Sequence, residues 1–263
     1  MGAARGQARP GRERHRARPR HRRLRRAGAG PARALRGRAA RAVGPRSAVT
    51  LERPAKLELY SDPRESATYD RRWSGWLGRA RNARKARAIE RGLARLGNPR
   101  VLLDAPCGNG RFSALLSGAG RRYLGADLAL PMLAAAAERH RDARYVAADL
   151  VRLPFPDHAF DAALCIRFLH LVRERELRIA VLRELARVSR VGLVVDYRHS
   201  RTLRVLGRRL RHRLGLRDRA PSNPSPAAIR GELAEANLEE LDWIPVHRSP
   251  WLSDKVLVVA RAR

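Results

Sequence analysis

Residues 101–112, VLLDAPCGNGRF, contain the pattern that decides the fold of this 263-residue chain. An apolar strand ends in Asp104, and a turn carrying Gly108 and Gly110 leads into a helix that begins near Arg111. In doubly wound sheets this arrangement gathers backbone N–H groups and a carboxylate at the carboxyl end of a parallel strand, where ligands bind. The two glycines permit close backbone approach or a positive φ. The stretch therefore predicts a ligand site at one edge of a parallel sheet.

Short apolar runs alternate with helical patterns from residue 100 onward, which is typical of β-α-β units. Helices are expected to begin near Arg111, Pro131 and Arg173 and to span residues 227–236. We predict an α/β fold with a doubly wound, mostly parallel seven-stranded sheet that ends in an antiparallel hairpin. The expected strands are residues 101–103, 123–126, 145–147, 162–165, 192–195, 241–246 and 256–260.

The chain is expected to divide into three parts. Residues 1–46 are rich in Arg, Ala, Gly and Pro and lack a periodic apolar face, so we expect a disordered arm. Residues 47–98 are expected to form a helical lead-in that covers the substrate. Residues 99–263 form the predicted ligand-binding domain, with a basic insert at 198–226.

The formal net charge is +32, and about half of it comes from residues 1–46, which hold sixteen arginines and a single acid, Glu13. Such an excess favours a polyanionic partner, either nucleic acid or an anionic membrane. Arg used together with Ala and Gly is also typical of a GC-rich genome. The charge therefore leaves two interpretations open, an arm that binds polyanions and a dispensable extension.

The chain gives three indications of compartment. Its two cysteines, Cys107 and Cys165, cannot form a disulfide framework or a four-ligand metal site, and no metal is predicted. No apolar stretch has the length of a membrane span, and no apolar core follows the basic N-terminus as in a secretory signal. The arm has too little Ser for an organellar transit peptide. A cytoplasmic location is expected.

Two further acids follow predicted strands. Asp127 comes seventeen residues after Gly110, at a position where an acid can accept both hydroxyls of a ribose. Asp149 and Leu150 follow the third strand, where a carboxylate can hold an exocyclic adenine amine and a leucine can cover the base. Each acid alone would be an ordinary solvated residue, but acids after three successive strands indicate a nucleoside site.

A dinucleotide site uses the same strand, turn and helix and is the main alternative ligand. It needs G-x-G-x-x-G with bare N–H groups for a pyrophosphate, whereas Ser113 occupies the third glycine position. Asp104 would also place negative charge at the phosphate end. A ligand with an ammonium group and no phosphate fits better.

Over residues 100–197 the chain resembles class I S-adenosylmethionine-dependent methyltransferases, in particular the group called methyltransferase type 11. The combined motifs are specific to fold and cofactor, and they do not specify a substrate. Pro106 departs from the pattern, because it stands at the first glycine of the family's glycine triplet and lacks an N–H to donate. The matching segments are 104–110, 125–133, 148–150, 153–157, 160–161 and 165–170.

The resemblance implies S-adenosylmethionine as cofactor. Asp104 and the backbone of 107–110 would hold its methionine part, Asp127 its ribose, and residues 149–150 its adenine. Leu128 and Met132 would line the adenine side, and residues 166–167 would lie beneath the sulfonium. The implied cofactor-binding residues are Asp104, Ala105, Pro106, Cys107, Gly108, Asn109, Gly110, Asp127, Leu128, Met132, Asp149, Leu150, Ile166 and Arg167.

His170 is the candidate catalytic residue, because a general base just past the fourth strand could help an oxygen or nitrogen nucleophile lose its proton. A histidine packed at the start of a helix explains it equally well. Tyr197 and His199 are weaker candidates. Methyl transfer can also depend on positioning alone.

Residues 200–217 place four leucines on one helical face amid arginines: Leu203, Leu206, Leu210 and Leu214. One interpretation is a lid packed over the active site with its arginines in water. The other is an interfacial helix that approaches anionic lipid and admits a lipophilic substrate. We favour the lid, although the two interpretations can coexist.

We expect an enzyme that transfers a methyl group from S-adenosylmethionine to a small-molecule or lipophilic acceptor. A nucleic-acid methyltransferase is the first alternative, because the chain is basic. Residues 165–168 (CIRF) replace the Asp/Asn-Pro-Pro-aromatic tetrad of amino-directed nucleic-acid enzymes and contain no Pro-Cys pair of the cytosine C5 kind. A non-catalytic cofactor-binding module is the second alternative, and the intact cofactor acids argue against it.

Overall fold

The computed structural model describes residues 2, 75–247, 249, 251 and 253–263. The expectations for the arm at 1–46, Gly2 aside, and for the first part of the lead-in, 47–74, lie outside these residues.

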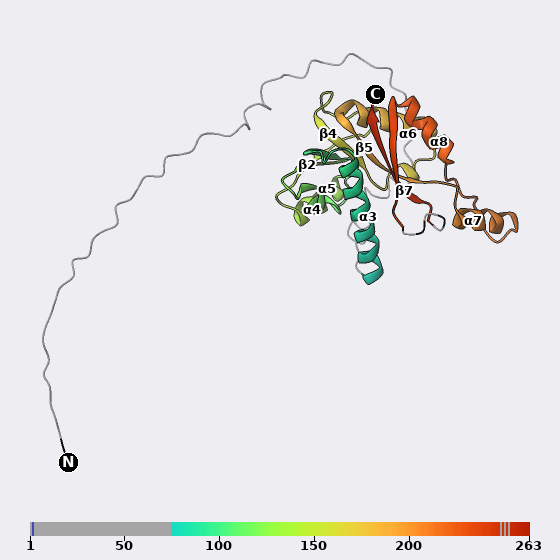
Figure 1. Ribbon diagram of the computed structural model, residues 1–263, viewed down its shortest axis with the longest axis horizontal. Coiled ribbons are helices and arrows are strands. Elements are labelled where there is room, and N and C mark those ends of the chain that lie inside the picture. The colour runs from blue at the N-terminus through green and yellow to red at the C-terminus, as the bar shows by residue number, and fades with distance from the viewer. Residues whose placement is uncertain (1, 3–74, 248, 250, 252) are drawn as a thin grey trace. The chain divides into compact units, whose positions relative to one another are not determined.

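The seven strands form one sheet with the order β3-β2-β1-β4-β5-β7-β6 (Figure 1). The strands β1 to β5 are parallel to one another, and β7 is antiparallel to both β5 and β6. The predicted doubly wound sheet with an antiparallel C-terminal hairpin is therefore confirmed. The strands are β1 (Val101–Asp104), β2 (Arg122–Asp127), β3 (Arg144–Ala147), β4 (Phe160–Cys165), β5 (Ser189–Arg198), β6 (Leu238–Pro245) and β7 (Lys255–Ala262).

Helices pack on both faces of the sheet (Figure 1). One buried cluster joins α3 and α4 to one face, and a second joins α6 and α8 to the other. The helix after β1 is five residues long and starts at Ser113, slightly later than its predicted beginning near Arg111. The helices are α3 (Trp76–Arg95), α4 (Ser113–Ser117), α5 (Leu130–Arg139), α6 (Arg175–Val188), α7 (Leu203–Arg213) and α8 (Pro226–Glu235), with a 3-10 helix η3 (Leu169–Leu171).

The strand order reverses direction at β1, and this positions the site. The chain runs outward from β1 through β2 to β3 and then returns to place β4 on the other side of β1. In open α/β sheets, ligands bind outside the carboxyl ends of the strands at such a switch point. The loop after Asp104 lies at this point.

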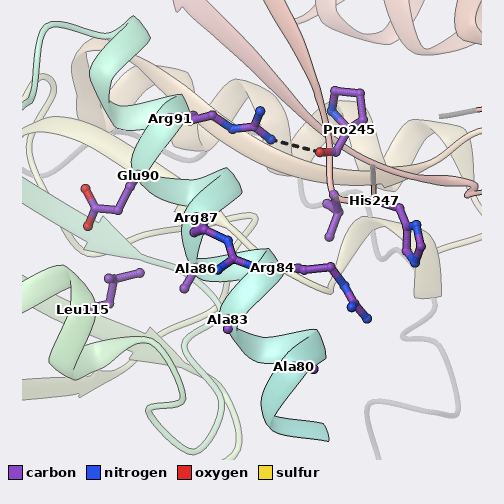
Figure 2. Close-up of a pocket in the computed structure, with 11 residues that line it drawn as sticks. Ala80, Ala83, Arg84, Ala86, Arg87, Glu90, Arg91, Leu115, Pro245 and His247 are labelled. Atoms are coloured by element: carbon purple, nitrogen blue, oxygen red, sulfur yellow. Dashed lines mark hydrogen bonds between the residues drawn. The ribbon is translucent and has the colours of Figure 1, made fainter. Parts of the chain in front are cut away.

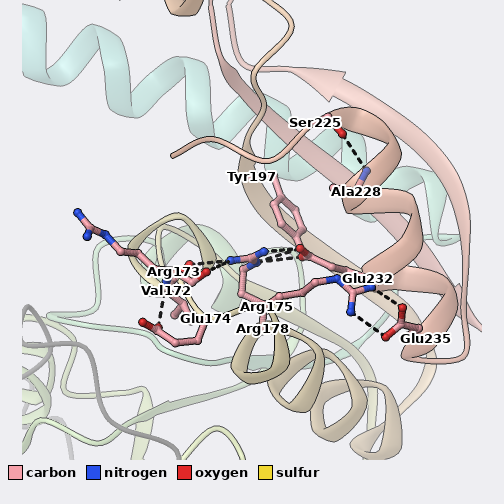
Figure 3. A network of polar contacts seen from close by, with 10 residues as sticks. All are labelled: Val172, Arg173, Glu174, Arg175, Arg178, Tyr197, Ser225, Ala228, Glu232 and Glu235. Carbon is pink, nitrogen blue, oxygen red and sulfur yellow. Dashed lines mark hydrogen bonds and ion pairs between the residues drawn. The ribbon is translucent and has the colours of Figure 1, made fainter. Parts of the chain in front are cut away.

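A buried ion pair fixes the face covered by α6 and α8 (Figure 3). The Nε of Arg178 donates to both carboxylate oxygens of Glu232 at 3.1 and 3.0 Å, and Glu232 is fully buried. Tyr197 donates its hydroxyl to Glu232 Oε2 at 2.8 Å. This network occupies the hydroxyl of Tyr197 on the far side of the sheet from α3. The suggestion that Tyr197 acts as a base is therefore wrong.

The face of α7 that the lid interpretation would bury is exposed. Its leucines are 55–62 % exposed: Leu203, Leu206, Leu210 and Leu214. The buried residue of the helix is Val205, on the opposite side, where Arg208 forms an ion pair with the buried Asp254 at 3.0 Å. A lid that packs its leucines and leaves all its arginines in water is therefore contradicted, although the helix itself forms as expected.

Candidate active site

The three predicted acids lie along one edge of the sheet. Asp104 is the last residue of β1, and Asp127 is the last residue of β2. Asp149 lies two residues beyond the end of β3. Because β1, β2 and β3 are parallel neighbours, the three carboxylates follow the same end of adjacent strands. Asp104 and Asp127 are close enough for the charge of one to raise the pKa of the other.

Asp127 is held by the loop that follows β1. Its Oδ2 accepts from the backbone N–H of Gly108 at 2.8 Å, and its Oδ1 accepts from the N–H of Ala129 at 2.9 Å. The adjacent N–H of Cys107 donates to the carbonyl of Ala126 at 2.8 Å. Since each carboxylate oxygen can accept more than one hydrogen bond, Asp127 keeps acceptor capacity for hydroxyl groups.

The turn accepts only glycine at position 110. Gly110 has a positive φ of 71°. A Cβ placed on it would lie 3.0 Å from the Cβ of Ala136 and 3.1 Å from the hydroxyl of Tyr145. The neighbouring carbonyl of Asn109 accepts from Arg139 at 2.8 Å. The loop is thus pinned to α5 while its backbone remains at the edge of the sheet.

Asp104 is buried, and only one of its two carboxylate oxygens accepts a hydrogen bond from the described part of the chain. It is 2 % exposed, and Oδ2 accepts from the hydroxyl of Tyr123 at 3.3 Å. Its Oδ1 has no hydrogen-bond partner among the described residues. Burial, together with a smaller effect of the charge of Asp127, raises the pKa of Asp104 to about 8. A cationic group placed against this oxygen would favour the carboxylate, so the site fits a ligand that carries an ammonium group.

A chain of hydroxyl groups reaches Asp104, and sequence reasoning missed it. Tyr145 donates to the Oγ of Ser113 at 2.9 Å, which donates to the hydroxyl of Tyr123 at 2.9 Å, which in turn donates to Asp104. Gly125 makes room for this chain, because a Cβ there would lie 2.6 Å from a ring carbon of Tyr145 and 2.8 Å from the hydroxyl of Tyr123. The available signal in the sequence was a glycine, Gly125, within a predicted strand, together with a tyrosine on the same strand and another on the next one.

The other predicted cofactor residues line the same edge in different degrees of burial. Leu128, just past Asp127, is 41 % exposed. The Oδ1 of Asp149 accepts from the N–H of Val151 at 3.2 Å. Arg167 has a positive φ of 66°, which turns the chain sharply after β4. The buried members of the set are Ala105, Cys107, Asn109, Met132, Leu150 and Ile166, whereas Pro106 and Gly108 are half-buried.

His170 lies in η3, just past β4 as expected. Burial, followed by the charge of Arg198, lowers its pKa to about 3, so the imidazole is neutral at physiological pH. Its Nδ1 is buried and has no hydrogen-bond partner within the described part of the chain. Nearby, Lys85 of α3 forms an ion pair with Asp196 of β5 at 2.8 Å. His199, the other candidate past β5, has its ring against Trp243.

A groove of about 1110 Å³ runs along the middle of α3 (Figure 2). It lies between α3, Leu115 of α4 and residues 245–247 at the end of β6, and Arg91 donates to the carbonyl of Pro245 at 3.1 Å. Arg84, Arg87 and Arg91 give it a basic side. None of the three acids lines this groove, so it is distinct from the edge where the acids gather.

Comparison with known families agrees with the predicted domain. Residues 103–195 match a family model described as a methyltransferase domain. The malonyl-[acyl-carrier protein] O-methyltransferase of Pseudescherichia vulneris is 44 % identical over 73 residues, which is 27 % of this chain and 29 % of the relative. The demethylmenaquinone methyltransferase of Mycobacterium tuberculosis is 37 % identical over 116 residues, 44 % of this chain and 46 % of the relative. The chain thus spans less than half the length of these curated relatives.

Solved structures share the fold at low sequence identity. The magnesium protoporphyrin IX methyltransferase of Synechocystis PCC 6803, solved with bound S-adenosylmethionine, superposes with a TM-score of 0.60 at 15 % identity. That match covers 82 % of this chain and 100 % of the solved one. The sheet and its covering helices are therefore those of the methyltransferase fold.

Proposed function

We propose that this chain transfers a methyl group from S-adenosylmethionine to a small-molecule or lipophilic acceptor, since residues 103–195 match a methyltransferase domain. The observation that carries the proposal is the unpaired oxygen of the buried Asp104. It lies at the switch point of the sheet, beside Asp127 and a loop that carries two glycines with positive φ. A cationic nucleoside matches this combination, and a pyrophosphate does not.

In this proposal, different residues bind different parts of the cofactor. Asp104 and the backbone of residues 107–110 would bind the methionine part, Ala105 and Pro106 would lie beside it, and Asp127 would bind the ribose. The adenine contacts come from Leu128, Met132, Asp149 and Leu150, and the contacts beneath the sulfonium come from Ile166 and Arg167. When bound, S-adenosylmethionine supplies an electrophilic methyl group. The chain would hold the acceptor next to that group, and positioning of this kind accounts for large rate effects.

His170 is proposed as the residue that takes a proton from the acceptor. It follows β4 at the same edge, and its neutral imidazole has a lone pair to offer at physiological pH. Burial, followed by the positive charges around it, lowers the pKa of His170 and makes it a weak base. An anion bound nearby would raise its pKa, so His170 suits an acceptor that brings negative charge.

The acceptor class rests on the named activities of the relatives. Two curated relatives are named for a malonyl group carried by a protein and for demethylmenaquinone, which are small or lipophilic acceptors. A third relative, 31 % identical over 100 residues, is named for a tRNA nucleoside, which corresponds to the nucleic-acid alternative. We propose an acceptor of the small or lipophilic kind, reached through a cover that includes the lead-in at 47–98.

The insert is proposed to contact an anionic membrane from a cytoplasmic location. The exposed leucine face of α7 is flanked by arginines, and the backbone carbonyl of Trp251, whose side chain is exposed, accepts from the N–H of Leu203 at 3.0 Å. Apolar side chains bordered by cations suit the interface of an anionic bilayer. No described helix is long and apolar enough to cross a membrane. Sedimentation with phosphatidylglycerol vesicles should recover the wild-type chain, and Leu206→Ser should reduce recovery several-fold, whereas phosphatidylcholine vesicles should recover neither.

The function is tested by following a labelled methyl group. The full chain is incubated with [methyl-¹⁴C]S-adenosylmethionine and an extract of its host, which is then separated into small-molecule, lipid, RNA and protein fractions. Label is expected in the small-molecule or lipid fraction, and Asp127→Ala should abolish it. Label that accumulates in RNA would establish the nucleic-acid alternative. The absence of transfer to any fraction, with a stoichiometrically bound cofactor, would indicate a non-catalytic module.

A further inference from the structure

Two cations face each other at the carboxyl edge of the sheet. Arg198 is the last residue of β5, Lys255 is the first residue of β7, and the antiparallel register pairs them directly. Side chains opposed in this way have Cβ atoms about 5 Å apart, and like charges there destabilise the sheet. We call Arg198 and Lys255 the edge cation pair.

The edge cation pair has no acidic partner within the described part of the chain. Neither side chain forms a hydrogen bond or an ion pair there, although both residues are half-buried. The two nearby acids are already engaged. Asp196 forms an ion pair with Lys85 at 2.8 Å, and Asp254 forms one with Arg208 at 3.0 Å. The pair therefore carries positive charge that the fold itself does not neutralise.

The positive charge of the edge cation pair contributes to lowered pKa values in the groups around it. Burial, followed by the charge of Arg198, lowers the pKa of Lys255 to about 8. The pKa of His170 is likewise lowered by burial first and by the charge of Arg198 second. Both shifts indicate cations in a region that is short of water and of negative charge. A bound anion would relieve both of them.

The edge cation pair lies close to the expected position of the transferred methyl group. Side chains alternate along β5, so Arg198 lies on the same face as Asp196, which contacts α3 through Lys85. The strand β5 pairs with β4, and neighbouring strands lie about 4.8 Å apart. Arg198 is therefore one strand away from the end of β4, where residues 166–167 are proposed to lie beneath the sulfonium.

We propose that the edge cation pair binds an oxyanion of the methyl acceptor, a carboxylate or a phosphate, and so selects acidic acceptors. This inference rests on the proposed function. The guanidinium of Arg198 can hold two oxygens of such a group, and Lys255 adds a point charge from the neighbouring strand. The anion would be placed at the side of the acceptor that faces β7, with its reacting atom toward β4 and His170.

The test measures the binding of simple oxyanions to the full chain by calorimetry at low ionic strength. Phosphate and malonate serve as probes, with and without saturating S-adenosylhomocysteine. The wild type should bind one anion per chain, and Arg198→Gln and Lys255→Gln should each weaken binding about tenfold or more, since each removes a charged hydrogen-bond donor. Arg198→Lys should recover part of the loss. The probe that binds more tightly indicates whether the acceptor group resembles a carboxylate or a phosphate.

Arg204→Gln is the matched control, because Arg204 lies exposed on α7 and its loss changes the net charge equally. An equal weakening in Arg204→Gln would show general charge attraction and overturn the proposal, as would a wild type that binds neither anion. Affinity for S-adenosylhomocysteine should stay within about twofold in all variants. If it falls in parallel with anion binding, the pair holds the carboxylate of the cofactor and the proposal is wrong. If the wild type does not bind S-adenosylhomocysteine at all but retains anion binding, the proposed function fails and the anion site stands.

Discussion

Replacing Asp104 with Asn should stabilise the empty protein and weaken cofactor binding. The pKa of Asp104 is raised from 3.8 to about 8 by burial in the folded state. A raised pKa means that the carboxyl group contributes its full stability below about pH 4 and loses it as the pH rises toward 8. At pH 7 the loss amounts to about 4 kcal/mol, at about 1.4 kcal/mol for each unit of pKa. Asn carries no charge and escapes this loss.

The stability arm of this prediction is a pair of melting curves. At pH 7, Asp104→Asn should melt on the order of 10 °C above the wild type, since 1 kcal/mol shifts a chain of this size by about 2–4 °C. The difference should shrink as the pH falls toward 4. Asp142→Asn, on an exposed loop, is the control and should leave the melting temperature unchanged. A variant that melts below the wild type at pH 7 would show that the carboxylate stabilises the fold, contrary to the reasoning.

The second part of this prediction concerns the number of protons released when S-adenosylhomocysteine binds. The empty protein holds Asp104 protonated at pH 6.5, and an ammonium group placed against it would drive the proton off. Calorimetry with S-adenosylhomocysteine in two buffers of different ionisation enthalpy should therefore detect about one proton released per ligand bound. Affinity should rise about tenfold per pH unit from pH 6 toward 7.5. Asp104→Asn should release no proton and bind more weakly. Binding without proton release in the wild type would refute the placement of the ammonium group.

The remaining predictions concern the groups around this carboxyl and the opposite face. Tyr123→Phe removes a hydrogen bond that lowers the pKa of the buried carboxyl, so proton release measured by calorimetry should extend to higher pH. Gly125→Ala should lower the free energy of unfolding by about 1–3 kcal/mol in urea titrations, because its methyl group would overlap two tyrosines, whereas Gly207→Ala, with open space around it, should not. Glu232→Ala should cost about 3–5 kcal/mol in the same titrations, because it leaves the buried Arg178 unpaired.

The sequence predicted the sheet because its signal is local. Each predicted strand is a short apolar run, and each lies within an observed strand except the sixth, which ends one residue earlier than expected. The placement of Asp104, Asp127 and Asp149 followed from parallel pairing, which brings the ends of successive strands to one edge. The antiparallel β7 followed from the short loop before it. These conclusions needed only pattern and topology.

The interactions between distant segments could not be predicted. The hydroxyl chain from Tyr145 to Asp104 joins β3, α4, β2 and β1 and depends on the space left by Gly125. The edge cation pair depends on the register of β5 with β7, which apolar periodicity does not fix. The orientation of α7 was misjudged because a leucine face usually packs inward, and here the ion pair of Arg208 with Asp254 holds the opposite face.

The most direct test of the account is calorimetric titration of the full chain with S-adenosylhomocysteine and, separately, with NAD⁺. The account predicts one S-adenosylhomocysteine bound per chain, loss of that binding in Asp127→Ala, and no heat from NAD⁺. Tight binding of NAD⁺, or unchanged binding of S-adenosylhomocysteine in Asp127→Ala, would contradict it.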